Sequence, residues 1–488
     1  MGSLRSFFKN IAAVCLVFLL VFTAMPQVAY GIAYDPEKDY ENLDIRFWED
    51  ETPGIGFYIN ASARYVLETV TEPNVGTTSG EWSVMDLLRG MYNGYDYINY
   101  IPEDYFMGYV HRVEQYVAER NGNLDRNKIT EWARLTLSLT ALGYDISDVA
   151  GHDFIERFSN SHRFSYRQGI NGPIWTLIAL NTGGYKLYED SDNPDANTEG
   201  KMLDYILDRE IVQTDGTVGG WALMGNIPDP DITGMALQAL APYYLDEGRY
   251  ERTGASVPYE EFVKAVERAI YVLSLIQREN GAFAAFGNVN AESTVQVIVA
   301  LTALGIDPLA ESIRLPHIGK TVNFITEGAV QDGVWTNDMI SALLTFWANG
   351  SGSSPEVGGF KHVTTGYDGG GGSGHGVNGM ATDQALYGLI AYDRFLKGEN
   401  PLYDMSDMQN GEYRNMTVKT YNVTFDNNGD VTNDAASPYA LIEIPSGAEV
   451  DGKTFTHWNT KADGSGTDYY PGEQLVMGSE EHTPSTKR

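Results

Sequence analysis

Two aspartates separated by one proline are the residues of this chain best suited to proton transfer. Asp229 and Asp231 flank Pro230, and Ile232 and Thr233 follow. Two neighbouring carboxyl groups raise the pKa of one of them, and a carboxyl group that stays protonated can act as a general acid. The run therefore offers two neighbouring carboxyl groups, those of Asp229 and Asp231, as candidates for proton transfer. It equally predicts a helix start, with Asp231 as the N-cap residue and Pro230 in the preceding loop.

Other polar residues recur at the starts of short apolar segments. If these segments are parallel helices, their N-termini meet on one face, where the positive ends of the helix dipoles gather. The polar residues can then cap the helices and balance the dipoles, or they can form a polar ring that binds a ligand or a cation. They are Glu81, Glu131, Asn171, Asp231, Glu292, Asn337, Asp338 and Asp383.

Most of the tryptophans fall in or just before the same segments. Their rings can line a cavity and stack on a sugar or a terpenoid, or they can fill the core. A carbohydrate-active site also needs two facing carboxyl groups, ~5–10 Å apart. Asp229 or Asp231 could form such a pair with Glu131 or Glu292. The tryptophans concerned are Trp82, Trp132, Trp175, Trp221, Trp335 and Trp347.

Two kinds of expected helix alternate between about residues 61 and 396. One kind is amphipathic with a charged face, as in 101–120, 201–210 and 259–277. The other is apolar on nearly every side and must be buried all round. Such an alternation predicts a mainly α fold, an α/α toroid of about six helical hairpins in two concentric rings. The apolar helices expected for the inner ring are 131–142, 174–180, 233–240, 294–304 and 383–396.

Internal repeats support a ring built from similar units. The seven residues 139–145 are nearly copied by residues 301–307, and each copy has a glycine, Gly143 or Gly305, where a helix should stop. A second pattern places Thr233, Thr294 and Thr382 each before two aliphatic residues at helical spacing. A threonine near a helix start predicts a cap.

The chain divides into four segments. Residues 1–33 are typical of a signal peptide, with a basic start, a short apolar run and small residues at a cleavage point. Residues 34–406 contain the toroid, with a core at about 61–396 and a Gly-rich insertion at 350–379, either a lid over the cavity or a surface loop. Residues 407–478 alternate like short strands and predict a small β domain. Residues 479–488 are expected to be disordered.

The charge and the cysteine content exclude several classes of function. The chain has 33 Lys and Arg against 66 Asp and Glu, and this net charge of −33 argues against binding to nucleic acid. Cys15, the single cysteine, lies in the signal peptide, so cleavage leaves no thiolate for a zinc site or for covalent catalysis. We expect no metal and no cofactor, and no membrane span once the signal peptide is removed.

The toroid region resembles the prenyltransferase and squalene-oxidase repeat superfamily, which includes terpene cyclases and the α-domain of cobalamin carriers. The resemblance rests on residues 81–82, 168–173, 229–237 and 290–308. It implies that Asp231 corresponds to the acid of those terpene cyclases that protonate an alkene or an epoxide, although Ile232 replaces the last aspartate of their motif.

The tail is similar to the Listeria–Bacteroides repeat, a β-grasp module of bacterial surface proteins. Residues 421–426, 455–467 and 470–472 carry this similarity. It implies a secreted or cell-surface setting. Within its superfamily, the toroid looks most like those of secreted proteins of Gram-positive bacteria.

These observations favour a secreted or surface-associated protein without catalytic activity, which binds a ligand or adheres to a cell-surface or host protein. The alternatives are a terpene cyclase-like enzyme that uses Asp231, a carbohydrate-active toroid enzyme and a purely structural stalk. The expected ligand is a small hydrophobic molecule or a carbohydrate. The expected ligand-binding residues are Glu81, Trp82, Glu131, Trp132, Asn171, Trp175, Trp221, Glu292, Trp335 and Asp383.

Overall fold

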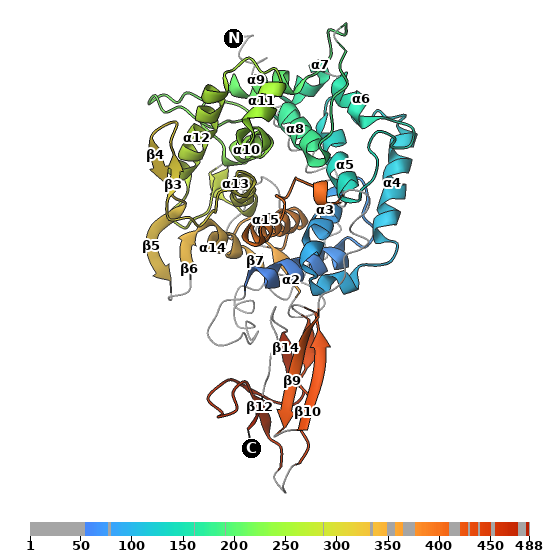
Figure 1. Cartoon of the computed structure of the whole chain (residues 1–488), viewed down its shortest axis with the longest axis vertical. Coiled ribbons are helices and arrows are strands. Elements are labelled where there is room, and N and C mark those ends of the chain that lie inside the picture. Colours follow the sequence, from blue (N-terminus) through green and yellow to red (C-terminus); the bar gives the residue numbers. More distant parts are fainter. Residues whose placement is uncertain are drawn as a thin grey trace, which may run out of the picture.

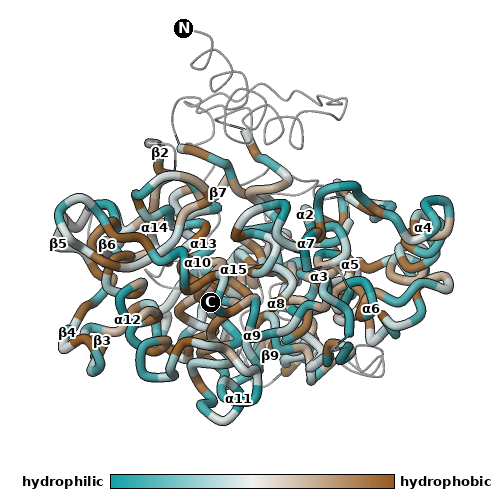
Figure 2. The backbone as a smooth tube through the Cα atoms, turned by 90° about the horizontal axis from the view of Figure 1, so that it is seen from above, coloured by the Kyte–Doolittle hydropathy of each residue, from teal (hydrophilic) through white to brown (hydrophobic). Residues whose placement is uncertain are grey.

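The computed structural model shows a ring of helices with a small β module beside it (Figure 1). It describes residues 54–76, 80–160, 162–190, 192–285, 287–331, 335–348, 357–364, 376–408, 420–427, 430–437, 440–449, 454–476 and 485–487. The expected signal peptide lies outside these residues. Seen from above, the ring is a layer that is wider than it is deep (Figure 2).

Six helices form the inner ring in the described part of the chain. Each packs against the next one along the chain, and the last packs against the first, so the ring closes. Their apolar residues are buried on nearly every side, as the sequence predicts for the inner layer. They are α3 (Glu81–Gly90), α5 (Thr130–Ala141), α8 (Asn171–Gly183), α10 (Pro230–Tyr244), α13 (Ala291–Ala303) and α15 (Gly379–Lys397).

The outer layer is made of amphipathic helices that alternate with the inner ones along the chain. In α4, for example, Tyr109, Val113 and Val117 form a buried stripe at helical spacing, while the opposite side carries charged residues. This confirms the expected two-layer arrangement. The outer helices are α2 (Ile55–Thr69), α4 (Tyr105–Glu119), α6 (Phe154–Ser159), α9 (Glu199–Leu207) and α12 (Tyr259–Ile276).

Strands replace the outer helix between α13 and α15. Two antiparallel pairs occur there, β3 (Ile313–Leu315) with β4 (Lys320–Val322) and β5 (Ile325–Gln331) with β6 (Trp335–Asp338). The short helix α14 (Met339–Leu344) and the pair β7 (Trp347–Ala348) and β8 (Gly359–Phe360) follow. The toroid is therefore less regular here than the sequence predicts.

The three repeated threonines do not cap their helices, which corrects the expectation. The caps are Asp229, Asn290 and Asn378, each four residues before a threonine. Each threonine hydroxyl instead bonds the backbone N–H of a buried aromatic residue in the preceding segment. The threonine thereby fixes the incoming segment against the inner helix. The pairs are Thr233 with Trp221, Thr294 with Phe283 and Thr382 with Phe360.

The two glycines of the other repeat end their helices as predicted. Gly143 and Gly305 have φ values of +64° and +71°, in the left-handed region where a side chain is strained. In each copy the next residue bonds back to the carbonyl of a leucine in the last turn, which is the Schellman pattern.

The segment that follows α15 closes one end of the ring. Residues 399–408 cross to α8, where the N–H of Met405 donates to the carbonyl of Thr182. The guanidinium group of Arg89, fully buried on α3, donates to three backbone carbonyls of this segment and to Asp407 at 2.6 Å. Arg394 on α15 also donates to Asp407. These bonds connect the first inner helix to the last.

The β module contains a five-stranded sheet with the order β10-β9-β15-β12-β13 and a separate pair, β11 with β14. Its core includes Val423, Phe425 and Trp458. The described residues of the module contain no helix, so the expected β-grasp fold is not confirmed. The strands are β9 (Tyr421–Asn427), β10 (Asp430–Ala436), β11 (Leu441–Glu443), β12 (His457–Asn459), β13 (Asp468–Tyr469), β14 (Gln474–Val476) and β15 (Ser485–Lys487).

Two segments differ from what the sequence predicts. Residues 485–487 of the expected disordered tail form β15, because they pair with β12 and β9 and complete the sheet. Residues 357–364 of the Gly-rich insertion pack into the toroid through Val357, Phe360 and Val363, so this part is no surface loop. The remainder of the insertion up to residue 375 lies outside the described residues.

Replacing Arg89 with methionine should destabilise the toroid by about 3–5 kcal/mol, because the buried acceptors of the closing segment lose their donor. Urea unfolding of the chain measures this loss. Arg209→Met, at an exposed arginine on the outer face, is the matched control and should change stability by less than about 1 kcal/mol. Equal losses in the two variants would contradict the role of Arg89 in closing the ring.

Candidate functional site

The inner helices begin on one face of the ring, and their first turns are in contact. Ser83 near the start of α3 donates to Asp383 near the start of α15 at 3.1 Å. Arg134 on α5 bonds Glu131 at 2.6 Å and lies 3.8 Å from Glu81 on α3. The inner helices are therefore parallel, as predicted, and most of the expected polar ring residues gather on this face.

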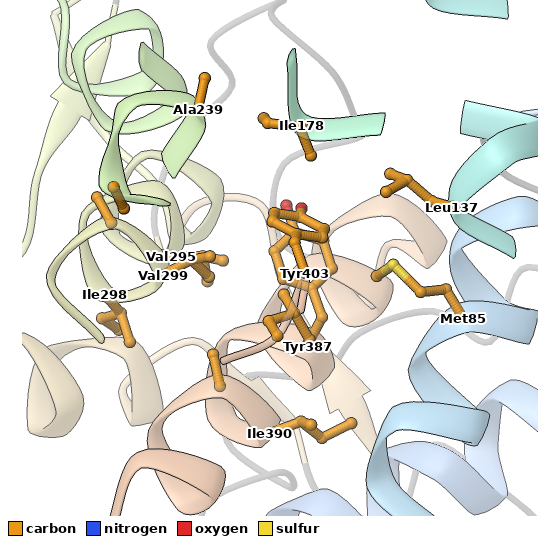
Figure 3. Packing of buried hydrophobic residues seen from close by; sticks show 14 of the residues in the cluster. Met85, Leu137, Ile178, Ala239, Val295, Ile298, Val299, Tyr387, Ile390 and Tyr403 are labelled. Atoms are coloured by element: carbon orange, nitrogen blue, oxygen red, sulfur yellow. The ribbon is translucent and has the colours of Figure 1, made fainter. Parts of the chain in front are cut away.

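The centre of the ring below this face is filled by aromatic side chains. Tyr403, from the closing segment, and Tyr387, from α15, stand between apolar residues of all six inner helices (Figure 3). Trp82 lies 5.5 Å from Trp175 and 5.8 Å from Tyr387, measured between ring centroids. Trp82 and Trp175 remain partly exposed. They form the floor of the face on which the helices begin.

Asp229 and Asp231 have different environments. Asp229 is the N-cap of α10 and accepts the N–H of Ile232 at 3.0 Å. Asp231 lies in the first turn and is not the cap; its Oδ1 is buried and has no hydrogen-bond partner in the described structure. Burial, and next the charge of Asp229, raise the pKa of Asp231 from 3.8 to about 7. Backbone N–H groups oppose the rise at Asp229 and the side chain of Ser293 opposes it at Asp231, but the rise is larger at Asp231, which is therefore the member of the pair that keeps a proton more readily.

Glu292 in the first turn of α13 belongs to the same group. Its Oε2 lies 2.7 Å from Nδ1 of His362, which the Gly-rich insertion places over the start of the helix. Glu292 is also among the charges that raise the pKa of Asp231, and His362 opposes this effect. The face therefore combines a carboxyl group whose pKa is raised to about 7 with a second carboxyl group that is paired with a histidine.

A second group of acids lies on α3 and α15, the latter packed against α13. Burial raises the pKa of Asp383 to about 7, and it also raises the pKa of Glu81 although Arg134 opposes it. Asp86 is fully buried, and neither of its carboxyl oxygens has a hydrogen-bond partner within the described ranges. Burial, and next the charge of Asp383, raise the pKa of Asp86 well above its ordinary value.

Amide side chains form a chain of hydrogen bonds that joins α10, α13 and α15. Gln238 donates to Gln296, and Gln296 donates to both Gln384 and Tyr387. This chain of hydrogen bonds holds Tyr387 beneath the acidic face.

Not every predicted site residue lies at this face. Trp132 points outward and packs against Phe164, and Trp221 is fully buried with its indole N–H on the carbonyl of Ile206. Both are therefore core residues and not ligand-binding residues. The sequence did not show this, because the position of a residue along the chain does not fix whether its side chain faces the ring centre. Trp335 lies in strand β6 instead of an inner helix, and its side chain is outside the described residues. Asn171 begins α8 as expected and is partly exposed.

Sequence reasoning missed several residues of the site. Arg134 was detectable, because it follows Glu131 at the i, i+3 spacing of a helical ion pair. His362 gave no usable signal, since it lies 70 residues from Glu292 in a segment interpreted as a loop. Asp86 and Tyr403 gave none either, because their roles depend on the closed ring.

Two further observations concern metal ligands and membrane spans among the described residues. They contain no group of three His, Cys, Asp or Glu side chains placed to hold a metal ion. None of the described helices is both long enough and apolar enough to cross a membrane.

Residues 421–483 match the model of the Listeria-Bacteroides repeat domain, which confirms the resemblance of the tail. No curated protein matches the chain. The similar solved structures include a complex of a UGL variant with dGlcA-Glc-Rha-Glc, with a TM-score of 0.45 and 16% identity, covering 72% of this chain and 98% of that chain.

Two further structures are similar at a lower level. An unsaturated glucuronyl hydrolase from Bacillus sp. GL1, described as responsible for the degradation of glycosaminoglycan, has a TM-score of 0.37 and 14% identity, covering 72% of this chain and 98% of that chain. Haptocorrin in complex with Cbi has a TM-score of 0.38 and 11% identity, covering 89% and 97%. With scores and identities this low, none of these proteins assigns an activity to this chain or singles out the prenyltransferase superfamily.

The raised pKa values predict an unusual dependence of stability on pH. The folded chain holds protons on Asp231 and Asp383 up to about pH 7, whereas the unfolded chain releases them near pH 4. Between these values the folded state binds more protons, so their contribution to stability is present below pH 4 and is lost as the pH rises to 7. Asp231→Asn, which cannot ionise, should reduce this loss in urea unfolding measured at several pH values.

Asp215→Asn is the matched control, because Asp215 is fully exposed and backbone N–H donors lower its pKa. It should leave the change of stability between pH 4 and 7 as it is in the unmodified chain. If Asp231→Asn behaves like Asp215→Asn, the carboxyl group of Asp231 is ionised at neutral pH and the assignment is wrong.

Proposed function

We propose that the face on which the inner helices begin binds a carbohydrate and that Asp231 acts there as the general acid in its cleavage. The observation that carries this proposal is the buried Oδ1 of Asp231, without a hydrogen-bond partner in the described structure, on a carboxyl group whose pKa is about 7. Such a group keeps a proton in about half of the molecules at pH 7, and the protonated form can donate to the oxygen of a leaving group.

The surrounding residues fit this chemistry. Trp82 and Trp175 present partly exposed aromatic rings, which stack well on the apolar faces of sugars. Glu292 is the second carboxyl group that hydrolysis requires, as either the nucleophile or the base for a water molecule. In this proposal His362, paired with Glu292 at 2.7 Å, keeps that carboxylate oriented. Glu131, across the ring from α13, completes the polar rim.

The alternatives have less support. A terpene cyclase holds its substrate in an enclosed apolar pocket, but in this ring Tyr387 and Tyr403 occupy the centre (Figure 3). A non-catalytic binding or adhesion protein does not account for a buried carboxyl group with a raised pKa at the start of an inner helix, because an uncharged side chain there would stabilise the fold more.

We also propose that the protein is exported and acts at the cell surface or outside the cell. The Listeria-Bacteroides repeat at residues 421–483 supports this setting, since such repeats occur in bacterial surface proteins. The basic and apolar start of the chain, residues 1–33, is the second support. A polysaccharide outside the cell is then a natural substrate.

A panel of neutral, uronic-acid-containing and unsaturated glucuronyl oligosaccharides tests the activity, with product formation followed by chromatography. We expect cleavage of at least one member, and Asp231→Asn should lower kcat by ~10²–10⁴-fold. Trp82→Ala should mainly raise KM, because it removes a stacking surface. Asp229→Asn keeps an N-cap residue but removes a charge, so it should move the alkaline limb of the pH profile to lower pH.

Two results would overturn the proposal. One is cleavage with an unchanged kcat in Asp231→Asn, which would place the acid elsewhere. The other is the absence of cleavage for the whole panel together with no thermal stabilisation by any member, since a ligand at 100 times its Kd should add about 2.7 kcal/mol.

A further inference from the structure

A pocket lined by arginines opens on the outer side of the ring. It has a volume of about 890 Å³, which is within the usual range for sites that bind small molecules. Four arginines and two aspartates are among its lining residues, in a chain whose net charge is −33. The arginines are Arg120, Arg126, Arg157 and Arg167.

Two of the four arginines, Arg157 and Arg167, lie against the same aromatic ring. The guanidinium carbon of Arg157 lies 4.2 Å from the ring centroid of Phe164, and that of Arg167 lies 5.3 Å from the same centroid. Arg157 also lies 4.5 Å from the ring of Trp132. Burial and the charge of Arg167 lower the pKa of Arg157. Arg157 and Arg167 therefore lie close together although their positive charges repel each other.

Arg120 lies 3.9 Å from Glu119, but the two aspartates that line the pocket make no ion pair with Arg126 or Arg167. Asp125 accepts the backbone N–H groups of Asn127 and Lys128, and Asp195 lies 3.4 Å from Arg163. Within the described structure no carboxylate is within ion-pair distance of Arg126 or Arg167. A surplus of positive charge therefore remains in the pocket.

The pocket adjoins the face that carries the proposed active site. Arg126 lies four residues before Thr130, which begins α5, and Arg167 lies four residues before Asn171, which begins α8. Since the inner helices begin on that face, both arginines lie at its outer edge. A ligand chain that crosses the face between α5 and α8 would reach them.

We propose that this arginine pocket binds the carboxylate or sulfate group of an acidic polysaccharide. Guanidinium groups bind such anions with two parallel hydrogen bonds, and Phe164 offers a surface for the sugar ring. The carbohydrate class of the ligand rests on the proposed function, whereas its negative charge rests on the pocket alone. The pocket compensates locally for a chain that otherwise repels anions.

Binding of labelled oligosaccharides to the chain, measured by fluorescence anisotropy, tests this site without reference to catalysis. The probes are an oligogalacturonate with carboxylates, a heparin hexasaccharide with sulfates and a neutral cello-oligosaccharide. At least one acidic probe should bind more tightly than the neutral one, and its binding should weaken as salt increases. Which acidic probe binds more tightly identifies the anionic group.

The double variant Arg126→Gln/Arg167→Gln should weaken binding of the acidic probe about tenfold or more. The control Arg209→Gln/Arg252→Gln makes the same change of charge at exposed positions and should leave binding within about twofold. Arg167→Lys should restore only part of the affinity, because lysine keeps the charge without the planar fork.

Equal losses in the double variant and in its control would contradict the pocket, as would equal binding of neutral and acidic probes. Tight binding of single-stranded DNA without binding of either acidic sugar would contradict the carbohydrate ligand. Asp231→Asn should retain the affinity for the acidic probe, so failure of the proposed catalysis and failure of this site give different results.

Discussion

The closure of the ring at Asp407 is the constraint on which the rest of the structure depends. Asp407 binds Arg89 at the end of the first inner helix and Arg394 at the end of the last one. The six inner helices are parallel. Since the first and the last of them end on this side of the ring, all six begin on the opposite face. The polar residues of their first turns then share one surface, and the closing segment places Tyr403 in the centre beneath it.

This arrangement explains why the acids of the face are difficult to ionise. Burial disfavours the charged forms of Asp231 and Asp383, and neighbouring carboxylates add repulsion. The folded state therefore loses stability as these groups ionise. Protein sites that tolerate such a cost commonly use the perturbed group in their chemistry. In the arginine pocket, burial and the charge of Arg167 likewise disfavour the charged form of Arg157.

The layered ring could be predicted from the sequence because it depends on local patterns: apolar helices, amphipathic helices and helix-ending glycines such as Gly143 and Gly305. The site could be predicted only in part. The threonine repeat was recognised, but its aromatic partners lie 12, 11 and 22 residues earlier, so no fixed spacing revealed its role. The directions of Trp132 and Trp221, and the contact of His362 with Glu292, depend on packing between distant segments.

A crystal structure of the Asp231→Asn variant with the oligosaccharide that stabilises the chain most would test the central claim directly. We expect a sugar ring in contact with Trp82 and Trp175, on the face where the inner helices begin. A glycosidic oxygen should lie within hydrogen-bond reach of residue 231. A sugar bound only to the β module or to the closed end of the ring would contradict it.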